Sequence, residues 1–161
     1  KSLLNFYMGS TATLQVKHSI RKKSKRYGIF PGLKIQSKLQ VGLAIDTSAS
    51  ISTSLLEIFW THISSLQRTQ LQFTIIEADA AVQAVYPLRK QQLPTIVKGR
   101  GGTDYNPTIQ FSNDKAFDLL IYFTDGEASI PTVKPKTPII WALSKKKHLS
   151  KFAGRSIFIK N

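Results

Sequence analysis

Short apolar runs bounded by turn residues recur from residue 40 onward, and their length suits strands buried on both faces of a parallel sheet. The run Gln40–Asp46 ends abruptly in a carboxylate, and the run Asp118–Asp125 repeats that design. The carboxyl ends of such strands are where ligands bind in open α/β sheets. The predicted strands are Gln40–Asp46, Leu71–Ala78, Ala81–Tyr86, Asp118–Asp125, Thr137–Leu143 and Arg155–Lys160.

Helical signals lie between these runs. Ser52 can cap a helix with apolar positions at spacings of three or four, and Asn106 as N-cap with Pro107 predicts a short helix through Phe111. A turn at Asp79-Ala80 predicts a hairpin. The whole order predicts an α/β fold, a doubly wound and mostly parallel sheet with one antiparallel edge strand. The apolar positions of the first helix are Leu55, Phe59, Ile63 and Leu66.

Residues 1–39 have a different pattern. Only Thr11–Val16 has enough Thr and Val for a short strand, and Arg21–Gly28 followed by Pro31-Gly32 is basic, turn-rich and extended in character. We therefore predict a basic N-terminal arm over residues 1–39, the end of a preceding region, and one folded domain over residues 40–161.

Composition narrows the class of protein. The 161 residues carry a net charge of +14, and all carboxylates lie between Asp46 and Glu127. A basic rim around an acidic centre would attract acidic partners, nucleic acid or anionic lipid. The plainer interpretation is that many lysines lie on a solvated surface, which would give the same net charge. No apolar stretch approaches the ~18 residues that span a membrane. The absence of cysteine excludes a thiolate metal site and is compatible with a cytoplasmic location.

Three segments carry oxygen ligands to the expected edge of the sheet. Asp46 is followed by Ser48 and Ser50, Thr103 lies on a glycine-rich loop, and Asp125 ends another buried strand. Carboxylate and hydroxyl oxygens suit a hard cation, so the set predicts a site for Mg²⁺ or Mn²⁺ with positions left for water and an outside carboxylate. The plainer interpretation is a strand end followed by serines that cap the next helix.

A phosphate-binding loop is the main rival for Lys98–Pro107. This segment lacks the Gly-Lys-Ser/Thr ending of a P-loop, and no Gly-x-Gly-x-x-Gly follows a strand. Of the remaining acids, Asp104 is expected to bond backbone amides near the next helix, and Glu127 to pair with a lysine of the C-terminal third.

Together, these motifs resemble the metal-ion-dependent adhesion site (MIDAS) of von Willebrand factor A (VWA) domains, which have a Rossmann-like fold. Over roughly residues 20 to 161 the chain is similar to the C-terminal VWA-like domain of a bacterial family of predicted metallopeptidases. The resemblance implies that Ser48, Ser50 and Thr103 bind the metal by hydroxyl, with Asp46 and Asp125 direct or through water. Ala49 and Arg100 replace usual glycines. The matching segments are Ser24–Gly28, Pro31–Gly32, Asp46–Ser52, Gly101–Tyr105 and Thr124–Glu127.

The function expected from this resemblance is a non-enzymatic module that binds a protein ligand presenting Asp or Glu, and it implies operation with an AAA-type ATPase. The peptidase activity does not transfer, because His-Glu-x-x-His is absent here. Two alternatives stay open. One is Mg²⁺-dependent phosphotransfer or hydrolysis with Asp46 as nucleophile, and the other is nucleic-acid binding through residues 17 to 38 with Tyr27 available for stacking.

Overall fold

The computed structural model describes residues 16–23, 31–35, 39–64, 71–88 and 101–159, and the chain divides into two compact units, residues 1–38 and 39–161. In the first unit, β1 (Val16–Lys23) and β2 (Pro31–Ile35) pair as an antiparallel hairpin. The sequence did not predict this hairpin within the basic arm. Apart from Val16, the strand expected at Thr11–Val16 lies outside the described residues.

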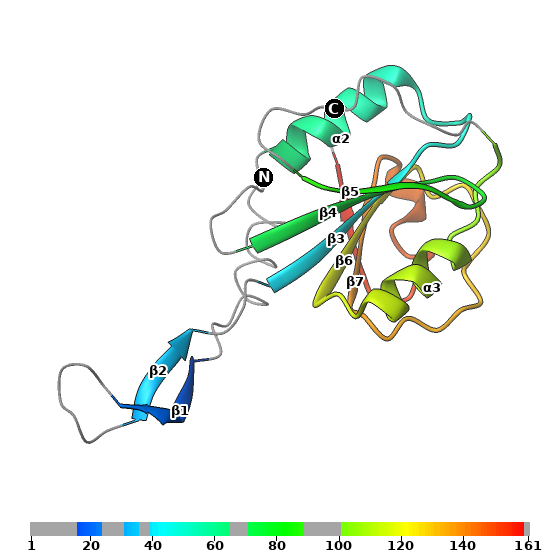
Figure 1. The fold of residues 1–161 in the computed structure, drawn as a ribbon. Coiled ribbons are helices and arrows are strands. Elements are labelled where there is room, and N and C mark those ends of the chain that lie inside the picture. The colour runs from blue at the N-terminus through cyan, green and yellow to red at the C-terminus, as the bar shows by residue number, and fades with distance from the viewer. Residues whose placement is uncertain (1–15, 24–30, 36–38, 65–70, 89–100, 160–161) are drawn as a thin grey trace. The chain divides into compact units, whose positions relative to one another are not determined.

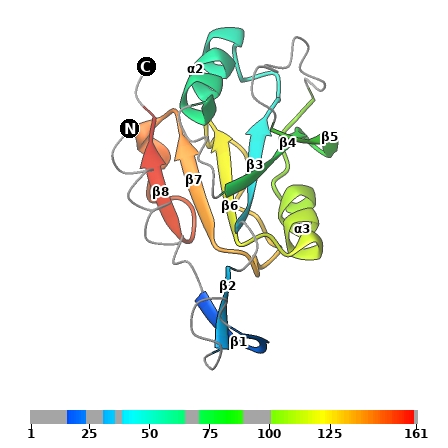
Figure 2. The ribbon, with the colours of Figure 1, turned by 60° about the vertical axis from the view of Figure 1, so that its left-hand side comes forward.

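The second unit is built on a six-stranded sheet (Figures 1 and 2). Its strand order is β5-β4-β3-β6-β7-β8, with every neighbouring pair parallel except β4 and β5. The predicted doubly wound sheet with one antiparallel edge strand is therefore confirmed. The strands are β3 (Leu39–Asp46), β4 (Leu71–Ala78), β5 (Val82–Pro87), β6 (Leu119–Thr124), β7 (Ile139–Leu143) and β8 (Arg155–Phe158).

Helices lie on opposite faces of this sheet (Figure 1). On one face α2 (Thr53–Ser64) packs Phe59 against Phe123 of β6, with ring centroids 5.4 Å apart. Ser52 accepts a hydrogen bond from the N–H of Leu55 (3.3 Å), as its predicted capping role requires. Leu66, expected on the same apolar stripe, lies outside the described residues.

Within the described residues, no helix has the length and apolar character needed to cross a bilayer.

The other face is covered by α3 (Asn106–Lys115) and an aromatic cluster. Trp141 of β7 stacks on Phe152 and Tyr122, at centroid distances of 4.3 and 5.3 Å, and Tyr105 meets Trp141 edge-on. These large buried rings fix the end of β6 relative to the start of α3. Both segments carry residues of the site described below.

The start and the end of α3 correct the sequence interpretation. The N-cap is Tyr105, without a side-chain bond, so Asn106 is the first helical residue, and the helix continues to Lys115 rather than stopping at Phe111. The Asn106 side chain instead accepts hydrogen bonds from the N–H groups of Thr132 and Val133 (2.8 and 2.9 Å). Its oxygen is used to hold the loop after β6, which a local capping rule could not foresee.

Between β7 and β8 the lysine-rich stretch forms a 3₁₀ turn, η1 (Lys146–His148). Such a turn is short because its hydrogen-bond geometry is poorer than that of an α-helix. It places several lysines beyond the carboxyl end of β7.

Candidate metal centre

The predicted site residues lie where the strand order of the sheet reverses. From β3 the chain continues to β4 on one side, whereas β6 lies on the other side. Asp46 is the last residue of β3, and Asp125 follows Thr124 at the end of β6. Because β3 and β6 are parallel neighbours, both carboxylates reach the crevice at the carboxyl edge.

Asp46 lies at the floor of this group and is fully buried (0% exposed). Its Oδ1 accepts hydrogen bonds from the Ser48 N–H (3.0 Å) and the Thr103 hydroxyl (3.4 Å), and its Oδ2 accepts one from the Thr124 hydroxyl (2.6 Å). Burial raises the pKa of Asp46, with a contribution from the nearby charge of Asp125, although the bonds from Ser48 and Thr124 oppose it. The described donors to Asp46 are neutral, so a cation would stabilise its charged form.

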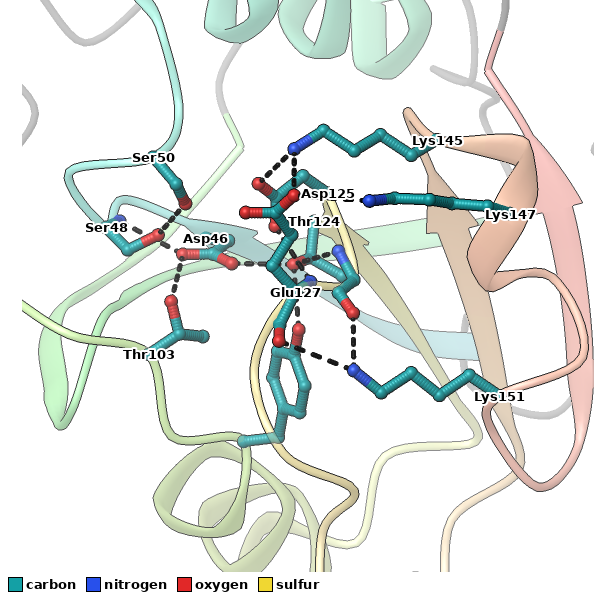
Figure 3. A network of polar contacts seen from close by, with 12 residues as sticks. Asp46, Ser48, Ser50, Thr103, Thr124, Asp125, Glu127, Lys145, Lys147 and Lys151 are labelled. Carbon is teal, nitrogen blue, oxygen red and sulfur yellow. Dashed lines mark hydrogen bonds and ion pairs between the residues drawn. The ribbon is translucent and has the colours of Figure 1, made fainter.

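Ser48 and Ser50 extend the group toward solvent. Their hydroxyls share a hydrogen bond of 3.1 Å, and Ser48 is buried whereas Ser50 is exposed. Figure 3 shows both side chains and Thr103 on the same side of Asp46. The structure therefore brings Asp46, Ser48, Ser50 and Thr103 into one hydrogen-bonded set at the edge of the sheet where they were expected to meet.

The loop that carries Thr103 is held by Asp79, a residue that the sequence analysis treated only as part of a turn. Its Oδ2 accepts the Gly101 N–H (3.2 Å), and its backbone carbonyl accepts the Asp104 N–H (3.0 Å). The carbonyl of Gly101 in turn accepts the Ala49 N–H (3.3 Å). Asp79 thus fixes the Thr103 loop, and Gly101 links that loop to the turn that carries the serines.

The acid at position 79 is held in its charged form. Burial alone would raise the pKa of Asp79, but hydrogen bonds from Gln83 and from the N–H groups of Ala81 and Gly101 outweigh it, and the pKa lies below its ordinary value. The signal that could have revealed this role is a carboxylate just after a buried strand, the same signal that marked Asp46 and Asp125.

Asp125 is also buried, but it faces a different partner. The Lys145 ammonium lies 3.2 Å from Asp125 Oδ2 and 2.6 Å from Glu127 Oε1, and Lys147 lies 3.8 Å from the same Glu127 oxygen. The predicted pairing of Glu127 with a C-terminal lysine is confirmed. Its hydrogen bond from Lys145 holds the pKa of Glu127 below the ordinary value. Lys145 itself was not predicted, although it follows the carboxyl end of a neighbouring strand.

Thr124 is a second residue that the sequence analysis did not assign. Its hydroxyl donates to Asp46 and accepts from the Gly126 N–H (3.2 Å). A hydroxyl has one donor, so the Tyr105 O–H, 3.1 Å away, must donate to Thr124. Thr124 thereby orients the Asp46 carboxylate from the side of β6. A threonine ending a buried strand directly before the second aspartate is the available sequence signal.

The loop after β6 is fixed by Lys151 and Gly126. The Lys151 ammonium donates to the carbonyls of Gly126 (2.7 Å) and Ala128 (2.5 Å). Gly126 has φ +82°, and a Cβ there would lie 2.9 Å from His148 Cβ, so only glycine fits. Gly126 therefore allows the chain to turn sharply as it leaves β6.

The donor set fits a hard divalent cation in its chemistry. It contains carboxylate and hydroxyl oxygens, and the buried Asp46 has neutral described donors. No cluster of three or more His, Cys, Asp or Glu side chains suited to a metal occurs in the part of the chain that the structure describes. A soft or histidine-rich site is thus not present there.

The predicted bonding of Asp104 is confirmed, because its Oδ1 accepts the Asn106 N–H (2.9 Å).

The fold is that of an α/β domain with a doubly wound, mostly parallel sheet. The model of one protein family, described as VWA-like domain (DUF2201), matches residues 41–160. The chain belongs to this family.

Two individual proteins are also similar to the chain. An uncharacterized protein of Thermotoga maritima is 22% identical over 148 residues, which cover 90% of this chain and 37% of that protein. The chain therefore spans little more than a third of that relative. The crystal structure of the ArnB paralog VWA2 from Sulfolobus acidocaldarius superposes with a TM-score of 0.46 at 15% identity, over 66% of this chain and 35% of that one. A likeness this weak carries no argument about function.

Proposed function

We propose that this domain is a metal-dependent protein-binding module whose MIDAS holds Mg²⁺ or Mn²⁺ through Asp46, Ser48, Ser50, Thr103 and Asp125. The observation that carries the proposal is the hydrogen-bonded set in which Thr103 and Ser48 donate to Asp46 and the Ser50 hydroxyl bonds that of Ser48. These residues come from the end of β3 with the turn that follows it, and from the separate loop that carries Thr103. Within the set, Asp46 is buried and Ser50 is exposed.

In this proposal each residue has a definite task. Asp46 supplies charge at the floor of the site, and Thr124 and the Ser48 N–H hold its carboxylate in one orientation. Ser50 and Thr103 keep hydroxyl oxygens near the solvent side. A divalent ion bound there would supply a Lewis-acidic position for an Asp or Glu side chain of the partner protein.

The basic arm is proposed to act at longer range. Lys22, Lys23, Lys25 and Arg26 would speed the approach of an acidic partner, and this contribution should fade as salt shortens the Debye length to about 8 Å. A carboxylate held directly at the metal site should resist salt and be lost with chelator. The two contributions are therefore separable.

The metal alone is the first probe. Isothermal titration of the whole chain with Mg²⁺ and with Mn²⁺ should give one site, and Asp46→Asn should remove it while the circular dichroism spectrum stays unchanged. Persistence of the same titration in that variant would contradict the assignment.

Displayed peptides provide the second probe. A random library selected on the immobilised chain in Mg²⁺ and eluted with EDTA should be enriched in Asp and Glu, and the Asp46→Asn chain should recover no such enrichment. For one recovered peptide, surface plasmon resonance should show an association rate that falls with salt and a dissociation rate that rises with EDTA. If chelation leaves dissociation unchanged, the metal has no part in adhesion.

Phosphotransfer remains the second candidate, and a phosphatase assay with and without Mg²⁺ separates it from binding. The full burial of Asp46 favours binding, since a nucleophilic carboxylate has to reach the phosphorus atom of its substrate. Three further expectations stay predictions. They are the association with a metallopeptidase region, an AAA-type ATPase partner and a cytoplasmic location.

A further inference from the structure

Lys145 joins the candidate metal centre from a strand that carries no predicted ligand. It lies two residues beyond β7, which pairs in parallel with β6, so it reaches the same edge of the sheet as Asp125. Its ammonium contacts Asp125 Oδ2 at 3.2 Å, and the side chains are 39% and 2% exposed. Figure 3 shows Lys145 extending across the face of Asp125. A lysine at the solvent boundary thus compensates a buried carboxylate.

Both oxygens of Asp125 are engaged in this arrangement. Oδ1 accepts the Glu127 N–H (3.1 Å), and Oδ2 accepts from Lys145. Asp46 differs, because its described donors are neutral. Of the two predicted acidic ligands, one therefore has its negative charge matched by a cation of the chain itself.

Glu127 is a second anionic partner for the Lys145 ammonium. Its Oε1 lies 2.6 Å from the ammonium, closer than Asp125 Oδ2, and its side chain is 47% exposed. Lys145 can therefore give up Asp125 without losing an anionic partner. A coupling between sites requires two arrangements, and here they would differ only in the contact between Lys145 and Asp125.

We propose that Lys145 is an intramolecular competitor of the divalent ion, which neutralises Asp125 in the metal-free domain and thereby sets the metal affinity of the site. This inference rests on the proposed metal-dependent function. It predicts that Lys145 weakens Mg²⁺ binding, and that metal loading and the Lys145–Asp125 contact exclude each other. The opposing interpretation is that Lys145 positions Asp125, in which case its loss would weaken Mg²⁺ binding.

Lys147 provides a matched control. Its ammonium lies 3.8 Å from Glu127, its side chain is 67% exposed, and no contact with Asp125 is described. Lys145→Met and Lys147→Met remove the same charge and keep a similar aliphatic stem. Only the first removes the cation from Asp125, so the difference between the two separates competition from a general change in charge.

Isothermal titration with Mg²⁺ at one fixed ionic strength tests the proposal. We expect Lys145→Met to tighten binding by about tenfold and Lys147→Met to change it by about twofold or less, a difference within the usual range of coupling between sites. Lys145→Gln, whose amide can still donate to Asp125, serves if the Met variant does not fold. In thermal melts, the rise in melting temperature from EDTA to Mg²⁺ should be larger for Lys145→Met than for the wild type.

Each outcome decides the matter. Equal tightening in the two lysine variants, unchanged affinity, or weaker binding in Lys145→Met overturns the inference and leaves the metal-dependent function intact. Binding by Lys145→Met alone, with none by the wild type, supports the inference and removes the metal-dependent function from the native chain. No Mg²⁺ binding by any variant overturns both.

Discussion

The ends of β3 and β6 make an instructive comparison, because the two strands are parallel neighbours and each delivers an aspartate to the same edge. At the end of β3, Asp46 is surrounded by hydroxyl and amide donors. At the end of β6, Asp125 meets the ammonium of Lys145. Two similar sequence motifs therefore have different electrostatic surroundings.

This difference predicts how each acid should behave without metal. An ionised carboxylate among neutral donors retains part of its desolvation cost, whereas one with a cation nearby has that cost offset. Asp46 should thus be the residue that gains most from a bound cation. Asp125 should contribute to the stability of the metal-free domain as well.

Asp46→Asn tests the expectation that Asp46 gains most from a bound cation, and it should have the largest effect on metal binding. The amide keeps the shape of the carboxylate and removes its charge, so we expect Mg²⁺ affinity to fall by about 100-fold or more, given the several kcal/mol that a charge in a low-dielectric site is worth. In EDTA the melting temperature should not be lower than that of the wild type. A much lower value would mean that the charge of Asp46 stabilises the fold by itself.

Asp125→Asn should lower the Mg²⁺ affinity less than Asp46→Asn does. Unlike Asp46→Asn, it should also lower the stability of the metal-free domain. We expect an affinity loss of about tenfold, since removing the charge of Asp125 also releases the competing Lys145. The free energy of unfolding in EDTA should fall by about 1 kcal/mol, because solvent screens the half-exposed ammonium. Urea unfolding of both aspartate variants, side by side, measures this contrast. Identical changes in the two would remove the distinction between the strand ends.

Asp79→Asn should weaken Mg²⁺ binding by several-fold, because the Gly101 N–H in the loop that carries Thr103 loses its charged acceptor. The free energy of unfolding should fall by about 1–2 kcal/mol, the usual cost of losing hydrogen bonds to a buried charged acceptor. Thr103→Ser is a suitable control, since it keeps the hydroxyl and leaves Asp79 in place.

The contribution of Asp79 also has a pH dependence whose sign is fixed. Its pKa in the folded chain lies below the ordinary value of 3.8, so its stabilisation is fully present above that pH and is lost as the pH falls through the lower folded-state pKa. Urea unfolding in EDTA at a series of acid pH values should show a shallower loss in Asp79→Asn than in the wild type. Parallel curves would assign the acid sensitivity to other carboxylates.

Glu127→Gln should have the smallest effect, a loss of Mg²⁺ affinity of about threefold, which is less than that of Asp125→Asn. Removing this exposed acid leaves Lys145 with Asp125 as its anionic partner, which strengthens the competing contact. Titration calorimetry in the Lys145→Met background should show a smaller effect of the same substitution. A loss larger than that of Asp125→Asn would identify Glu127 as the ligand.

The sequence by itself determined the fold class and predicted four residues that the structure brings together, Asp46, Ser48, Ser50 and Thr103. Apolar runs of strand length predicted the succession of strands along the chain, because a strand buried on both faces is apolar at nearly every position. The motif from Asp46 to Ser50 is local, so its spacing already fixes that these side chains share one turn. Thr103 was predicted from the glycine-rich loop, and the structure places its hydroxyl on Asp46.

Only the tertiary structure decided what surrounds the carboxylates of Asp46, Asp79 and Asp125. Asn106 was expected to cap α3 and instead binds the loop at Thr132, because the packing of that loop on the helix competes with a local cap. Thr124, Asp79 and Lys145 reach the site from three different strand ends, at sequence separations of 78, 22 and 20 residues from Asp46, Gly101 and Asp125. No local pattern encodes such contacts, since they exist only once the register of the parallel strands brings their carboxyl ends together.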